Sequence, residues 1–207
     1  MPRDAGEPAR LQLIPDHGKL MHLFLIREPQ LDALAHLHPA RTGSRSFRVA
    51  APPLPAGTYR LYADITNETG FAATLTTTIE LPTVTAETAS AVPRDPDDSW
   101  FVGTPSSTAN DTVTLTHTAP VALRAGEDVT LIFAATDPAG HPVELEPYMG
   151  MLGHAAVRRA DGSVFAHLHP TGTISMAAQL YFQRSAAEQT GQPPPMDHSQ
   201  HAMAVNG

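Results

Sequence analysis

The sequence has no cysteine and only one lysine, Lys19, in 207 residues. The lack of cysteine excludes disulfides, thiolate zinc sites and thiol catalysis. A metal-binding chain of this composition has to use histidine, methionine and carboxylates. Acidic residues outnumber lysine and arginine by 21 to 13, which gives a formal net charge of −8 and leaves no basic stripe to neutralise phosphates. We therefore expect no nucleic-acid partner.

Long apolar runs are absent as well. No run approaches the ~20 residues that cross a bilayer, so we expect no membrane span in this chain. The start of the sequence lacks the apolar region of a signal peptide. Because the chain reaches its first histidine motif almost at once, we expect either a cytoplasmic protein or one whose export signal or membrane anchor has been removed.

Aromatic residues make up only 6% of the chain, whereas 20 prolines and 14 glycines interrupt short apolar stretches. This pattern predicts many turns and short strands. Residues 58–66, TYRLYADIT, alternate clearly, with Tyr59 and Leu61 on one face. We predict an all-β fold of one or two small antiparallel β-sandwich units of immunoglobulin or cupredoxin type. The expected strands are 20–27, 34–38, 46–50, 58–66, 71–81, 112–118, 121–123, 129–135 and 143–145, with a short helix only at 175–185.

The composition divides the chain into four segments. Residues 11–82 form the first expected β unit, and residues 111–182 form the second. Residues 83–110 are rich in threonine, alanine, proline and aspartate and are expected to be a linker. Residues 183–207 are expected to be a flexible tail that begins with an extended proline spacer and holds methionine and histidine.

Two segments of the chain share one histidine-rich pattern. Each has P-x-x-G-x-L-x-H, then 13 residues in the first copy or 12 in the second, and then H-L-H-P. The first copy lies at residues 15–39 and the second at residues 147–170. So many matched positions are hard to attribute to chance, and we interpret each copy as a metal-binding hairpin. The histidines are His22, His36 and His38 in the first copy and His154, His167 and His169 in the second.

The Asp161-Gly162 pair predicts a two-residue hairpin turn in the second copy. Counting outward from this turn places His154 opposite His169. Side chains alternate between the two faces of a strand, so these residues and His167 share one face. Three neighbouring imidazoles on one face match the donor set of a metal ion.

The first copy predicts the same arrangement with a loop one residue longer. Pairing His22 with His38 leaves residues 29–31 as a three-residue loop and puts His36 on the same face. Directly opposed Cβ atoms lie about 4.5–5.5 Å apart, a spacing that lets imidazoles converge on one ion.

The segment upstream of each hairpin supplies candidates for a fourth ligand. His17 in the first copy corresponds to Met149 in the second, and both side-chain types bind copper. Met151 is a further candidate, whereas Met21 has the wrong strand parity in the expected register. The histidines without a partner in either copy are His117 and His141.

Three imidazoles suit copper(II), zinc and other late first-row ions. Nearby thioethers favour copper, so copper is the expected cofactor and zinc is the alternative. Carboxylates are few near both copies, which makes calcium and magnesium poor candidates. A blue-copper electron carrier is excluded, because that site requires a cysteine thiolate.

The two HLHP hairpins and the TYRLYADIT strand resemble a group of bacterial extracytoplasmic proteins with small immunoglobulin- or cupredoxin-like domains, related to those called YtkA-like. The resemblance covers most of residues 11–82 and 112–176. It implies a periplasmic or extracellular-facing location and a role in metal handling. The tail segment MDHSQHAM resembles the methionine- and histidine-rich segments of bacterial copper-resistance proteins. It contains Met196, His198, His201 and Met203.

Three functions are consistent with these patterns. The leading one is extracytoplasmic copper sequestration, delivery or resistance without catalysis. Its expected partner is a metal ion, and a copper-handling protein is a further candidate. The second is a metalloenzyme in which three protein ligands leave a position open for water. The third is an adhesion or assembly module without a metal, in which the histidines pack across an interface or sense pH.

Overall fold

The computed structural model describes residues 12–84, 94–103, 108–109, 113–118, 124 and 126–170. In this part of the chain all regular elements are strands, and the paired strands run antiparallel, so the predicted all-β antiparallel fold is confirmed. The strands of the described residues are β1 (Leu13–Ile14), β2 (His22–Glu28), β3 (Ala33–Leu37), β4 (Ala40–Arg41), β5 (Phe47–Arg48), β6 (Gly57–Asn67), β7 (Ala72–Leu81), β8 (Ser99–Val102), β9 (Thr108–Ala109), β10 (Val113–Thr118), β11 (Ile132–Thr136), β12 (Ala155–Arg158) and β13 (Phe165–Leu168).

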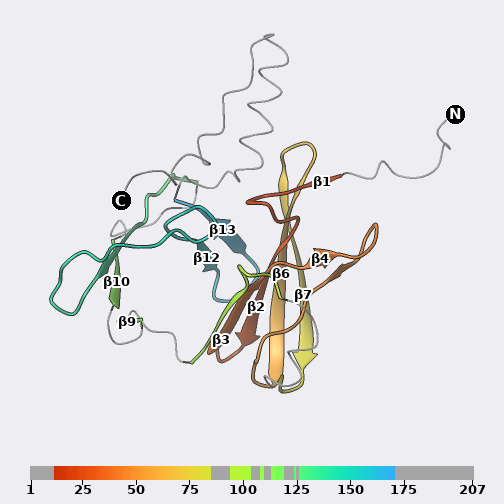
Figure 1. The fold of residues 1–207 in the computed structure, drawn as a ribbon, viewed down its shortest axis with the longest axis horizontal. Helices are drawn as coiled ribbons and strands as arrows, with labels where there is room; N and C mark the ends of the chain where they lie inside the picture. Colours follow the sequence, from red (N-terminus) through yellow and green to blue (C-terminus); the bar gives the residue numbers. More distant parts are fainter. Residues whose placement is uncertain are drawn as a thin grey trace, which may run out of the picture. The chain divides into compact units, whose positions relative to one another are not determined.

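The largest sheet is built around β6, the long strand predicted from the TYRLYADIT alternation. Strand β6 pairs with β1 and β2 along one edge and with β7 along the other. Strand β3 follows β2, and β8 closes the sheet beyond β3 (Figure 1). In this register Leu25 of β2 lies between Leu61 of β6 and Ala35 of β3, so apolar side chains line up across the sheet.

One face of this sheet carries the hydrophobic core. Alternation along β2 and β6 turns Leu25 and Tyr59 toward this face, and both side chains are almost fully buried. Leu54, from the segment that precedes β6, packs against them. The buried residues of the cluster are Leu25, Ala33, Ala35, Leu37, Leu54 and Tyr59.

The opposite face of the sheet is covered by the hairpin of β12 and β13. Phe165 of β13 stacks on Tyr62 with ring centroids 4.2 Å apart and contacts Phe24 at 5.0 Å. The Tyr62 hydroxyl donates a hydrogen bond to the carbonyl oxygen of Gly162 at 3.1 Å. Tyr62 is therefore as fully buried as Tyr59, although the two residues point to opposite faces of β6. The sheet is thus covered on both sides at β2 and β6, whereas most of β7 is exposed.

Ion pairs join the same hairpin to the sheet. The carboxylate of Glu28, at the end of β2, pairs with the guanidinium of Arg158 from β12. It also accepts hydrogen bonds from Nε of Arg60 at 3.1 Å. These side chains are mostly shielded from solvent, so the three charges connect β2, β6 and β12 more strongly than exposed pairs would.

Contacts divide the chain into two units, residues 1–103 with 147–207, and residues 104–146. The second histidine hairpin belongs to the same unit as the first, whereas the expected division into 11–82 and 111–182 placed the two hairpins apart. The physical reason is that β12 and β13 turn their face with Phe165 and His167 onto the sheet of the first unit, where Phe165 packs on Tyr62 and His167 lies beside His22. The range 83–110, expected as a linker, contains β8, which pairs with β3.

The second unit, by itself, contains a three-stranded antiparallel sheet in the order β11-β10-β9. The turn expected at residues 137–140 is present, and the amide of Gly140 donates to the carbonyl of Asp137 at 2.9 Å. Residues 143–145, expected as a strand, do not form one.

The expected strand 121–123 and the expected helix 175–185 lie outside the described residues. No helix among the described residues is long and apolar enough to span a membrane.

Candidate metal centre

The segment before each histidine hairpin forms a tight turn of the same kind in both copies. Asp16 and Lys19 exchange backbone hydrogen bonds of 2.8 and 2.9 Å, and Tyr148 and Met151 exchange bonds of 2.8 and 3.1 Å. Both central residues of each turn have positive φ, as in type I′ turns. The values are 49° at His17, 78° at Gly18, 52° at Met149 and 79° at Gly150. The sequence repeat is thus a structural repeat.

The hairpins have the predicted registers. In the second copy Ala155 pairs with Leu168 and Ala156 with His167, which continues to His154 opposite His169. In the first copy Leu23 pairs with Leu37, which continues to His22 opposite His38. The turn of the second hairpin differs in detail. Its hydrogen bond runs from the amide of Gly162 to the carbonyl of Arg159, so Ala160 and Asp161 are central and Gly162 follows with a φ of 72°.

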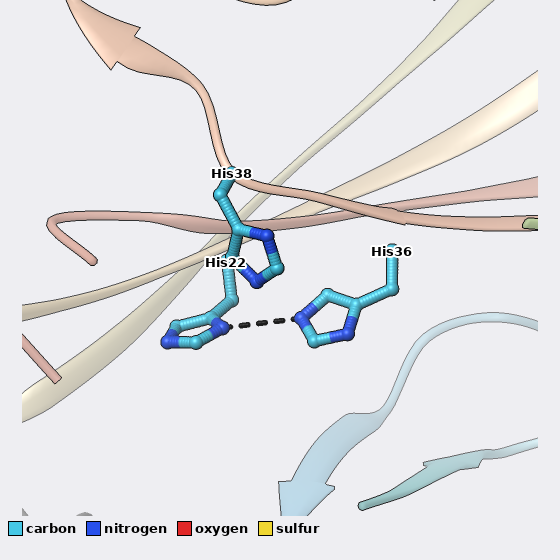
Figure 2. Close-up of side chains that lie close together, drawn as sticks. All are labelled: His22, His36 and His38. Atoms are coloured by element: carbon cyan, nitrogen blue, oxygen red, sulfur yellow. Dashed lines mark hydrogen bonds between the residues drawn. The ribbon is translucent and has the colours of Figure 1, made fainter. Parts of the chain in front are cut away.

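The first triad is formed by His22 of β2 and by His36 and His38 at the end of β3. His22 Nδ1 lies 3.1 Å from His36 Nε2 (Figure 2). His22 Nε2 lies 3.2 Å from the carbonyl oxygen of Asp16 in the upstream turn. Because a carbonyl only accepts, Nε2 carries the proton, and the lone pair of Nδ1 points into the triad.

The second triad repeats this arrangement. His154 Nδ1 lies 3.2 Å from His167 Nε2, and His154 Nε2 lies 3.2 Å from the carbonyl oxygen of Tyr148, the counterpart of Asp16. The three ring-centroid separations are 5.3, 5.1 and 4.6 Å in the first triad and 5.4, 5.1 and 4.5 Å in the second. The two triads therefore have the same geometry ring by ring.

Each triad has the dimensions of a metal site. Its three residues each offer one nitrogen, and these nitrogens lie within 4.8 Å of one another. Two nitrogens that bind one ion at about 2.0–2.1 Å lie about 2.8–3.4 Å apart for angles between a right angle and the tetrahedral value. The observed 3.1 and 3.2 Å fall in this range. Histidine triads positioned to hold a metal ion are present in both copies.

Buried nitrogens without a hydrogen-bond partner also point to a metal. Nε2 of His38, of His169 and of His17 are buried and unpaired. A buried polar atom without a partner costs free energy, so such atoms need an explanation. His38 and His169 occupy equivalent positions in the two copies, and a metal ion at each triad would accept their lone pairs. The residues present therefore fit a metal.

Carboxylates orient some of these rings from outside the triads. Asp98 Oδ1 accepts a hydrogen bond from His38 Nδ1 at 3.2 Å, which leaves His38 Nε2 unprotonated and turned toward the triad. His167 Nδ1 lies 3.7 Å from Asp64 Oδ2. Asp95 lies 4.0 Å from His38 Nδ1 and is held by Lys19. Such partners fix the tautomer of a ligating imidazole.

These aspartates are the part of the site that sequence reasoning missed. Asp95 and Asp98 lie in the range expected as a linker, and their chain segment returns to the triad through β8. Asp64 lies directly opposite His22 in the pairing of β6 with β2. Asp64 lies on the same face of β6 as Tyr62, which the alternation of TYRLYADIT predicts. This pattern places Asp64 near the histidines only once β6 is known to pair with β2.

His17 lies closer to the second triad than to its own. Its ring centroid is 4.7 Å from that of His169 and 5.7 Å from that of His154, against 6.3 Å from that of His22. Burial lowers the pKa of His17, although the backbone of Met149, in the equivalent turn of the other copy, is near enough to raise that pKa. His17, expected as a fourth ligand for the triad of its own copy, thus lies nearer to the rings of the second triad.

The other methionine and histidine residues considered as ligands lie outside the two triads. Met149 and Met151 occupy the turn before the second triad, and both are half-buried, like Met21. His141 is exposed and hydrogen-bonded to Asp137 in the second unit. His117 lies on β10 of that unit, opposite Phe133. The tail residues Met196, His198, His201 and Met203 lie outside the described residues.

Burial and mutual repulsion favour the neutral form of His22, His36, His38, His154 and His169. Burial, with repulsion from His167 and His38, lowers the pKa of His22 to about 2. Burial, with repulsion from neighbouring rings, also lowers the pKa of His36 to about 2, of His154 to about 4 and of His169 to about 3. For His38, burial outweighs the opposing effect of Asp98 and lowers the pKa. Neutral imidazoles are the form that binds metal, so their lone pairs are available at neutral pH.

Fold and site together define an all-β protein with two histidine triads that are positioned to bind metal. The family model of a domain of unknown function, DUF8832, matches residues 3–83 and 107–192. These segments include both histidine copies and most of the chain, so the protein belongs to this family. No curated protein and no solved structure matched the chain.

Proposed function

We propose that this chain is an extracytoplasmic copper-binding protein that sequesters or delivers copper or confers resistance to it. The observation that carries the proposal is the pair of matching histidine triads, each with its nitrogens within 4.8 Å of one another. Each triad contains a buried Nε2 that has no hydrogen-bond partner among the described residues, at His38 and at His169. Two copies of one motif have kept this geometry although their sequences differ between the fixed positions.

Copper is favoured by the donor set. For a given nitrogen site, copper(II) is bound most tightly among the divalent first-row ions. The triads consist of imidazoles alone, and aspartates sit behind the rings as hydrogen-bond acceptors. The turn before the second triad carries Met149 and Met151, and thioethers bind copper(I). Zinc is the alternative, because it also accepts three imidazoles.

The burial of the rings favours a protein that retains a metal ion over an enzyme that uses the ion in catalysis. His22, His36 and His38 are 2%, 6% and 5% exposed. A catalytic centre needs a position open to water and substrate. Rings this deeply covered suit retention of an ion. The resemblance to bacterial extracytoplasmic metal-associated proteins supports a location outside the cytoplasm. The lack of cysteine is compatible with this location, because a chain without thiols has none to be oxidised there.

Metal titration of the untagged full chain tests the proposal. Calorimetry with copper(I), copper(II) and zinc, together with elemental analysis, is expected to give two copper ions per chain and tighter binding of copper than of zinc. Replacing His22, His36 and His38 by alanine, or His154, His167 and His169, is expected to remove at least one ion. The exposed His141→Ala exchange is the matched control and is expected to leave both ions bound.

Circular dichroism of each triple variant separates loss of ligands from loss of fold. Should a triple variant unfold, single His→Gln exchanges within the same triad replace it. Equal copper binding by the wild-type chain and by folded variants of both triads would refute the proposal. Tighter binding of zinc would keep the metal site and reject copper.

A further inference from the structure

The two triads lie within the first unit as one group of rings. His167 of the second triad lies 5.2 Å from His22 and 5.5 Å from His36 of the first, measured between ring centroids. Neighbouring rings within a triad lie 4.5–5.4 Å apart. The separation between the triads therefore matches the separation inside them. With His17 beside His169, seven imidazoles form a continuous cluster.

We propose that this cluster is one centre that holds two metal ions, and that His17 from the first copy is a ligand of the ion held by the second triad. The proposal rests on the metal binding argued above and adds to it. If the two triads bound their ions independently, their rings would not need to contact each other. The contact between His22 and His167 instead places any two bound ions no more than about 12 Å apart, given metal–nitrogen distances of about 2.0–2.1 Å.

His17 has the position that this role requires. Among the described residues its Nε2 is buried without a hydrogen bond, with Asp16 Oδ1 3.7 Å away, and Nε2 of His169 is likewise buried without a hydrogen bond. Ligand atoms of Asp16, His17 and His169 lie within 4.8 Å of one another. The backbone of His17 is left-handed, with a φ of 49°, a conformation that costs energy for a residue other than glycine. Met149 has the same conformation in the second copy, so the conformation belongs to the turn, and in the first copy this turn places the imidazole of His17 beside His169.

The two ions would have unequal surroundings. The residue equivalent to His17 in the second copy is Met149, so the first triad receives no fourth imidazole from that turn. The carboxylates are also divided, with Asp98 beside His38 of the first triad and Asp64 beside His167 of the second. Carboxylates beside both triads reduce the repulsion between two nearby cations. The centre is thus built for two ions at distinguishable sites.

Anomalous diffraction at the copper edge from crystals of the copper-loaded full chain tests the two-ion centre. Two peaks in one chain, no more than about 12 Å apart, with His17 Nε2 bound to the ion of the second triad, are the expected result. A single ion per chain, or two ions farther apart, would overturn the proposal while leaving metal binding intact. A chain that binds no copper in the titrations would instead overturn the proposed function.

Titration of His17→Asn with copper(II) tests the ligand in solution. Asparagine tolerates the left-handed backbone, so the turn is retained. One of the two binding events is expected to weaken at least tenfold, while the other stays within twofold of the wild-type value. His141→Asn is the matched control and is expected to change neither event. Wild-type affinities for both ions in His17→Asn would remove His17 from the centre.

Discussion

The carboxylate of Asp98 accepts two hydrogen bonds from one residue, His38. Asp98 Oδ1 lies 2.7 Å from the backbone nitrogen of His38 and 3.2 Å from its Nδ1. Both side chains are 1% exposed. This pairing holds the ring with Nδ1 protonated, so that Nε2 faces the first triad.

Asp98→Asn is therefore expected to lower the copper affinity of the first triad by about 10–100-fold. The amide keeps the shape of the side chain but removes the charge that stabilises the oriented imidazole. Asp97→Asn is the matched control, because Asp97 pairs with Lys19 and not with a histidine. Calorimetric titration with copper(II) measures both variants. Equal affinities in the two variants would show that Asp98 does not orient a ligand.

The buried imidazoles predict that the metal-free protein loses stability in acid. His22 and His36 have folded-state pKa values lowered to about 2, whereas an unfolded histidine titrates near 6.5. Between these values the unfolded chain binds protons that the folded chain does not, so stability is present above about pH 6.5 and is lost as the pH falls. At pH 5.5 each such ring lowers the free energy of unfolding by about 1.4 kcal/mol relative to neutral pH.

Urea unfolding of the metal-free chain at pH 7.5 and pH 5.5 measures this loss. His36→Gln is expected to show a smaller difference between the two pH values, because it lacks one of the titrating rings. An unchanged midpoint and slope in the wild-type chain would contradict the assignment of neutral buried rings.

Packing of Phe165 on Tyr62 predicts that the second hairpin stabilises the sheet of the first. Phe165 is half-buried and contacts both Tyr62 and Phe24. Phe165→Ala is expected to lower the free energy of unfolding by about 2 kcal/mol, less than for a fully buried phenylalanine. Val164→Ala is the control, since Val164 is the adjacent residue and is 53% exposed, and its effect is expected within about 0.5 kcal/mol. Equal effects would mean that the hairpin does not pack on the sheet.

Local patterns were sufficient to predict the hairpins. Strand alternation and the number of loop residues fix the register, so His154 could be placed opposite His169, and His22 opposite His38, without any tertiary information. The equivalence of the upstream turns followed from the spacing of glycine and histidine. The long strand β6 was evident from its alternation of apolar and polar residues.

Contacts between distant residues could not be predicted in the same way. The hydrogen bond from Tyr62 to Gly162 joins residues 100 positions apart, and the pair of Glu28 and Arg158 joins residues 130 apart. Neither leaves a periodic signal in the sequence. The contact of the two triads depends on this packing, and so does the approach of His17 to His169. The expected β units, 11–82 and 111–182, were drawn from local patterns and carry no information on this packing.

The two upstream turns predict equal costs for equivalent glycine substitutions. Gly18 and Gly150 have φ values of 78° and 79°, and a Cβ atom at either would meet nothing within 4 Å. Gly18→Ala and Gly150→Ala are each expected to lower the free energy of unfolding by about 1 kcal/mol through left-handed backbone strain alone. Gly153→Ala is the matched control, because its site is equally open and its φ lies outside the left-handed region. Urea unfolding of the metal-free variants measures the three effects, and costs at Gly18 and Gly150 no larger than at Gly153 would contradict the two matching turns.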